Sequence, residues 1–127
     1  MDARDLLTRL CEAIDAHDWD ALHPLLHDDF TCRYVHTGES FGKESWVRLN
    51  ADYPGFDHLV VEDMVASGDR AVARCHVTGY VDGELTHFEV ATFISAQDGL
   101  ITDMTEVWTD IDQTAPEGTR PDPGQIG

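Results

Sequence analysis

One carboxylate in the sequence, Glu106, is a candidate for proton transfer. It lies in the segment 99–110, where alternation of apolar and polar residues predicts a strand and places Glu106 on the same face as Met104 and Trp108. A carboxylate among apolar neighbours is costly to bury unless it is paired, hydrogen-bonded or protonated. Such a group can act as a general acid or base. It can equally be a structural carboxylate that bonds to Arg74 or to the backbone.

The segment 71–81 supplies two further candidate groups, Arg74 and His76, on one face of a predicted strand. That face either lines a polar pocket or forms the outer surface of the sheet, and the sequence favours neither. If the face is internal, His76 and Glu106 form an acid and base pair, since histidine titrates near neutrality.

The strand predicted for residues 85–96 carries a similar ambiguity. His87 and Glu89 share one of its faces, and an internal Glu89 would raise the pKa of one of the two carboxyl groups, Glu89 or Glu106. If that face is external, both residues meet solvent or an interface.

Tyr34 and His36 alternate along the segment 30–36 and so point the same way. A phenol and an imidazole in that position could polarise a ligand carbonyl; the alternative is a core tyrosine and a solvent-exposed histidine. We expect Trp46, Met104 and Trp108 to form an apolar wall.

No metal site or cofactor is expected. His23 and His27 stand four residues apart, followed by Asp28 and Asp29, which is a possible ligand spacing. Surface helices of acidic proteins carry such pairs by chance. The three cysteines have no C-x-x-C spacing, which argues against a zinc ribbon and a disulfide framework.

Composition limits the possible partners. The chain has 127 residues, enough for one domain, and 8 Lys plus Arg against 25 Asp plus Glu give a net charge of −17. This charge repels nucleic acid and anionic membranes. The sequence shows no signal-peptide pattern and no apolar run long enough to span a membrane. We therefore expect a cytoplasmic protein with no nucleic-acid or membrane partner.

The periodicity predicts helices first and strands afterwards. Residues 3–16 have an amphipathic helical pattern, Asp18 precedes a short second helix that Pro24 limits, and residues 43–53 form a third helix. Strands are predicted at 30–36, 58–66, 71–81, 85–96 and 99–110, the last four separated by short turns. The layout is α+β: three N-terminal helices on a strongly curved, mostly antiparallel sheet, in the shape of a cone.

The order of these elements resembles the nuclear transport factor 2-like superfamily, and within it the SnoaL-like small proteins. The resemblance rests on Asp18-Trp19-Asp20-Ala21-Leu22, Leu26-His27-Asp28-Asp29-Phe30, Gly42-Lys43-Glu44, Asp98-Gly99-Leu100-Ile101 and Glu106-Val107-Trp108-Thr109-Asp110. It covers roughly residues 3–111, and we predict one domain over residues 1–111. Prolines and glycines replace the periodicity in residues 112–127, which predicts a flexible tail. The resemblance also implies a homodimer paired through the open face of the sheet.

The resemblance says less about activity, because this fold hosts several chemistries as well as proteins with none. The tyrosine and two aspartates of ketosteroid isomerases correspond to positions near Leu10, Tyr34 and Ala91, and none matches. The chain is similar to the limonene epoxide hydrolases at two places: Arg74-Cys75-His76 resembles their inner-strand Arg-x-Asp, with histidine in place of aspartate, and Glu106 resembles their last-strand aspartate.

We therefore predict a protein that binds an apolar small molecule in a pocket around Glu106. Catalytic roles are assigned to Glu106, His76 and Tyr34, and ligand binding to Arg74, Met104, Trp108, Trp46 and His36. If the protein is an enzyme, we expect a cofactor-independent isomerase, cyclase, dehydratase or hydrolase. The alternative is a non-catalytic ligand-binding protein or a dimeric scaffold.

Overall fold

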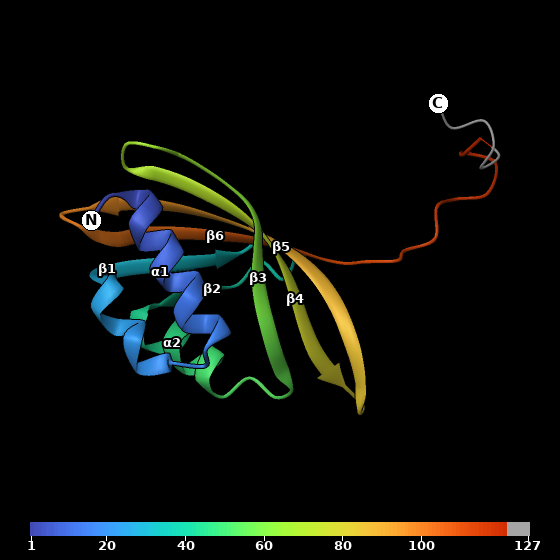
Figure 1. Cartoon of the computed structure of the whole chain (residues 1–127), viewed down its shortest axis with the longest axis horizontal. Coiled ribbons are helices and arrows are strands. Elements are labelled where there is room, and N and C mark those ends of the chain that lie inside the picture. The colour runs from blue at the N-terminus through green and yellow to red at the C-terminus, as the bar shows by residue number, and fades with distance from the viewer. Residues whose placement is uncertain (122–127) are drawn as a thin grey trace.

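The computed structural model describes residues 1–121 and contains one six-stranded sheet with helices on one side (Figure 1). The elements in chain order are α1 (Ala3–Asp15), the 3-10 turns η1 (Trp19–Ala21) and η2 (His23–Leu25), β1 (Leu26–Tyr34), β2 (Ser40–Gly42), α2 (Lys43–Ala51), β3 (Phe56–Ser67), β4 (Arg70–Val81), β5 (Glu84–Gln97) and β6 (Leu100–Asp110). The α+β prediction is confirmed.

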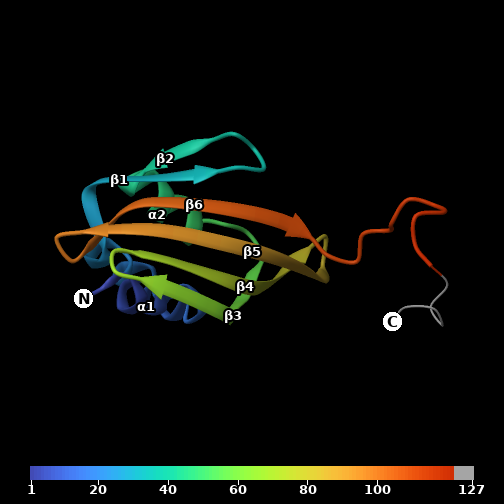
Figure 2. The ribbon, with the colours of Figure 1, turned by 90° about the horizontal axis from the view of Figure 1, so that it is seen from above.

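The strands lie in the order β2-β1-β6-β5-β4-β3, visible from one edge to the other in Figure 2. All neighbours are antiparallel except β1 and β6, which run parallel. The sheet curves around the helices, and this pairing places the N-terminal strand β1 directly beside β6. Tyr34 is the register partner of Glu106 as a result.

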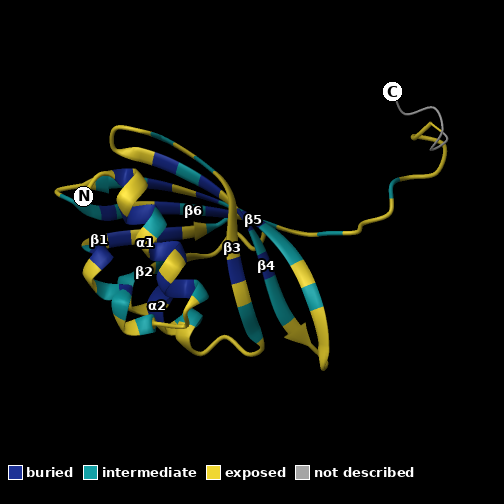
Figure 3. Ribbon diagram, viewed as in Figure 1, coloured by how far each residue is buried: buried dark blue, intermediate teal, exposed yellow. Residues whose placement is uncertain are grey.

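The first helix forms and docks as its sequence pattern predicts. Asp2 caps α1 by accepting a hydrogen bond from the Asp5 amide at 2.9 Å. Its apolar stripe is buried against the sheet, with Leu6 and Leu7 fully inaccessible. Figure 3 shows the buried residues gathered between the helices and the sheet.

Two predictions about the N-terminal half need correction. The expected second helix is two one-turn 3-10 segments, because Pro24 lies at the start of η2 and cannot donate within a longer helix. Within residues 1–121, two α-helices, α1 and α2, therefore accompany these turns. The first strand starts at Leu26 rather than at residue 30, and His36 falls in the turn after β1.

The chain beyond β6 continues away from the sheet (Figure 1). Gln113 folds back, donating from Nε2 to Thr109 Oγ1 at 3.1 Å and to the Asp110 carbonyl at 3.0 Å. The domain boundary at residue 111 and the flexible tail stay predictions, and residues 122–127 of that tail lie outside the described part. Within residues 1–121, no helix has the length and hydrophobicity needed to span a membrane.

Candidate functional site

The Glu106 carboxylate is buried at the inner face of β6, with 6% of the residue exposed, and accepts three hydrogen bonds. Trp46 Nε1 donates to Oε2 at 3.1 Å, and Trp108 Nε1 donates to Oε1 at 3.0 Å. The Cys32 thiol donates to Oε2 at 3.4 Å. The two indole N–H groups can only donate and the thiol is placed to donate, so all three contacts favour the charged form of the carboxylate.

Burial and hydrogen bonding act on Glu106 in opposite directions. Removal from water raises the pKa of the carboxyl group above its ordinary value of 4.5, and the bonds from Cys32, Trp46 and Trp108 oppose that rise. Burial prevails, so the pKa is raised. A carboxylate with a raised pKa is a stronger base than one in water.

The neighbouring strand β1 places two proton-bearing groups beside Glu106. Cys32 and Tyr34 lie on the inner face, and burial, together with the charge of Glu106, raises the pKa of both. Each therefore keeps its proton at neutral pH. Tyr34 is held between two aromatic rings, stacked on His36 at 5.3 Å and edge-on to Phe41 at 4.9 Å between ring centroids.

A cavity of about 520 Å³ opens beside this carboxylate. Glu106, Tyr34 and His36 contribute its polar groups near β1 and β6. Most of the wall is aromatic or aliphatic, including Trp19, Tyr53, Phe56, Tyr80, Phe88 and Trp108. An apolar wall with a few convergent polar groups is typical of a small-molecule site.

The sequence and the fold agree on one family. The family model described as a SnoaL-like domain matches residues 7–104. This chain belongs to the SnoaL-like family. The match confirms the predicted resemblance, but it ends before Glu106 and so gives that residue no role.

Solved structures with the SnoaL-like fold superpose on most of the chain. A candidate ketosteroid isomerase from Kribbella flavida is 24% identical, with a TM-score of 0.79 over 90% of this chain and 82% of the other. A candidate SnoaL-like polyketide cyclase from Jannaschia sp. is 20% identical, with a TM-score of 0.73 over 84% of each chain.

An epoxide hydrolase from M. tuberculosis resembling limonene epoxide hydrolase is 18% identical, with a TM-score of 0.72 over 84% of this chain and 82% of the other. The search of curated proteins gave no match. At these identities the likeness establishes the fold and leaves the chemistry open.

Five of the predicted site residues surround the carboxylate of this SnoaL-like domain or lie in the core next to it. Tyr34, His36 and Trp108 line the cavity; Tyr34 is partly buried, whereas His36, stacked on it near Trp108, is exposed to solvent. Trp46 is 1% exposed and Met104 is 2% exposed; neither lines the cavity. Trp46 therefore serves Glu106 as a donor, whereas Met104 is a core residue.

The structure corrects the expected partnership of Arg74 and His76 with Glu106. Ala73 and Cys75, the alternating residues of β4, are fully buried beneath the helices, so Arg74 and His76 point out of the opposite face. Arg74 contacts Glu62 and Glu89, and His76 contacts Glu89. The similarity of Arg74-Cys75-His76 to an inner-strand Arg-x-Asp therefore does not extend to the site.

Sequence reasoning did not identify Cys32 as a contact of Glu106, nor Trp46 as a hydrogen-bond donor. Alternation along β1 puts Cys32 on the same face as Phe30 and Tyr34, and this pattern could have indicated that Cys32 lies near the site. No local pattern relates Trp46 to Glu106, since 60 positions separate them and α2 must fold over the sheet to join them.

Proposed function

We propose that this SnoaL-like protein binds an apolar carbonyl compound and transfers a proton at the carbon next to the carbonyl, without a cofactor. The observation that carries the proposal is the buried Glu106 carboxylate, held by two indole N–H groups at the wall of an aromatic cavity. Isomerisation and cyclisation can both pass through the enolate that such a transfer forms.

The two principal groups have complementary roles. Glu106 accepts the α-proton of the substrate, because its raised pKa makes the carboxylate a competent base. Tyr34 keeps its proton and donates a hydrogen bond to the oxygen of the forming enolate. In a β,γ-unsaturated carbonyl compound the enolate is conjugated, so proton return from Glu106 to the γ-carbon moves the double bond and completes an isomerisation, with charge balanced throughout.

Exchange of α-protons for deuterium tests this role without knowledge of the natural substrate. We expect the protein to catalyse exchange into 2-tetralone in D₂O, measured by the loss of the α-proton NMR signal. Glu106→Gln should slow this exchange at least about a hundredfold, the usual scale for a general base. Tyr34→Phe should slow it about a hundredfold through loss of the donor.

The matched control is Glu39→Gln, which removes an exposed carboxylate outside the cavity lining and should leave the exchange rate unchanged. Exchange that is equally fast in Glu106→Gln and in the unmodified protein would contradict the proposal. Binding of 2-tetralone is measured separately, from the tryptophan fluorescence of the protein, since Trp19 and Trp108 both line the cavity.

The second candidate is a ligand-binding protein without catalysis. It is favoured by the three donors that Glu106 already engages, because a carboxylate has only about four lone-pair sites. In that case Glu106→Gln would weaken 2-tetralone binding, and no variant or unmodified protein would accelerate exchange.

A further inference from the structure

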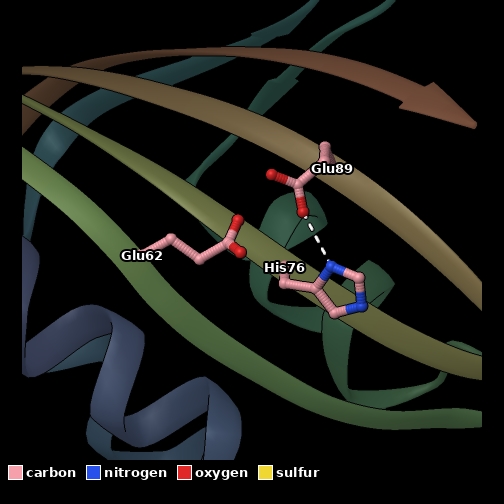
Figure 4. Close-up of side chains that lie close together, drawn as sticks. All are labelled: Glu62, His76 and Glu89. Carbon is pink, nitrogen blue, oxygen red and sulfur yellow. Dashed lines mark hydrogen bonds and ion pairs between the residues drawn. The ribbon is translucent and has the colours of Figure 1, made fainter. Parts of the chain in front are cut away.

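Three side chains that bind metals in many proteins converge on the outer face of the sheet (Figure 4). Glu62 comes from β3, His76 from β4 and Glu89 from β5, and one ligand atom of each lies within 4.8 Å of the others. Ligands bound to zinc at about 2.0–2.2 Å lie roughly 3 to 4 Å from one another. Small side-chain rotations would therefore close the three around one ion.

A break in the strand register accompanies this arrangement. The pairing of β3 with β4 shifts between Val61 and Asp63, which leaves Glu62 as the extra residue. Bulges of this kind redirect a side chain. The Glu62 carboxylate reaches the outer face, where Arg74 Nη1 donates to its Oε1 at 2.9 Å.

Neighbouring groups hold the three ligands in position. Arg74 Nη1 also contacts Glu89 Oε1 at 3.3 Å, so it engages one oxygen of each carboxylate, and Glu89 Oε2 faces His76. His76 Nε2 lies 2.8 Å from His87 Nδ1. His76 Nδ1 is hydrogen-bonded to Glu89 Oε2 at 2.8 Å, and a carboxylate oxygen can only accept, so a metal ion would replace the proton on Nδ1. With a proton on Nε2 donated to His87, the Nδ1 lone pair would then bind the ion, as the second ring nitrogen of a metal-bound histidine usually donates to a neighbour.

From this geometry we propose that Glu62, His76 and Glu89 bind one divalent transition-metal ion, with zinc as the best match. An imidazole with two carboxylates suits zinc better than magnesium or calcium, which prefer oxygen ligands alone. Three protein ligands leave one position for water or an added ligand. The site uses the sheet face opposite Glu106 and is independent of the proposed proton transfer.

No metal site was expected, because the one recognisable ligand spacing, that of His23 and His27, arises by chance on the surface helices of acidic proteins. In the structure His23 contacts Glu44 and His27 contacts Asp29, so these two imidazoles have separate partners. The ligands proposed here come from three strands with irregular separations, a pattern that no short motif represents.

Isothermal titration of ZnCl₂ into the untagged full-length protein tests the site. We expect one equivalent to bind, and His76→Gln and Glu89→Gln to weaken the affinity at least about tenfold, since even indirect partners of a metal contribute that much. His58→Gln is the matched control, because His58 forms a comparable surface pair with Asp15 at 2.9 Å. It should bind zinc as the unmodified protein does.

Two results would overturn the proposal: no zinc binding by the unmodified protein, or equal affinity in the control and in both ligand variants. The second result would mean that zinc binds adventitiously at other surface groups. Circular dichroism verifies the fold of each variant. If either ligand variant fails to fold, Glu62→Gln decides between the same two outcomes, because it removes the third proposed ligand.

Discussion

The ionisation of Glu106 links the proposed chemistry to the stability of the protein. Its pKa is raised in the folded state, so the folded protein holds this proton more tightly than the unfolded chain does. The stability linked to the proton is fully present below the ordinary pKa of 4.5 and is lost as pH rises through the folded value. Between the two values the slope approaches about 1.4 kcal/mol per pH unit.

Glu106→Gln should remove this pH dependence, because a glutamine side chain does not titrate. We expect the free energy of unfolding of the unmodified protein, minus that of the variant, to fall as pH rises above 4.5, the ordinary pKa of the carboxyl group. Urea unfolding of both proteins measures this difference. The contributions of the other titrating groups to the pH dependence are the same in both proteins and cancel. A difference that stays constant or rises over that range would contradict a raised pKa.

At the scale of elements, Gly55 fixes the approach of the segment before β3 to the end of β4. It has φ +79°, accepts a hydrogen bond from the Tyr80 amide at 2.7 Å, and lines the cavity. A methyl group at this position would collide with the Tyr80 carbonyl oxygen. Only glycine satisfies both the backbone conformation and the contact.

Gly55→Ala should therefore lower the free energy of unfolding by at least about 2 kcal/mol, from the left-handed backbone and the collision together. Gly38→Ala is the matched control, because Gly38 has φ +76° and open space around its Cα hydrogens. It should cost about 1 kcal/mol. Chemical denaturation compares the two, and equal losses would show that the Tyr80 contact is unimportant.

The elements were predictable where one periodicity dominated. The stripe of leucines in α1 and the alternating strands, separated by turns at Gly68, Gly83 and Gly99, all lie near their expected places. The faces of β4 were not predictable. Its small residues, such as Ala73, are buried under α1. From the sequence of β4 alone, either the face with small residues or the face with polar residues could have pointed toward the helices.

Contacts between distant elements were also beyond sequence reasoning. The burial of Glu106 could be expected from Met104 and Trp108, its apolar neighbours on the same face of the strand. The hydrogen bond from Trp46 to Glu106 could not, because it depends on how α2 packs on the sheet. The register shift at Glu62 has no local signal, and it determines which carboxylates meet His76. These two features define the two candidate sites, one on each face of the sheet.

At the scale of the molecule, we expect two copies to pair through the outer face of the sheet. Phe93 and Val107 are exposed there, at 40% and 41%, on the neighbouring strands β5 and β6. Exposed apolar groups on adjacent strands favour association. Phe93→Glu should convert a dimer to a monomer in light scattering after size exclusion, whereas Val35→Glu, in the turn after β1, should not. A monomeric unmodified protein would contradict this expectation.

An NMR titration of the Glu106 side-chain carboxyl carbon, with and without bound 2-tetralone, measures most directly whether this group is the base of a ligand site. We expect a pKa above 4.5 in the free protein and a further rise when the apolar ketone displaces water from the cavity. A pKa at or below 4.5 that does not respond to the ketone would mean that Glu106 is a hydrogen-bonded structural carboxylate rather than the base of a ligand site.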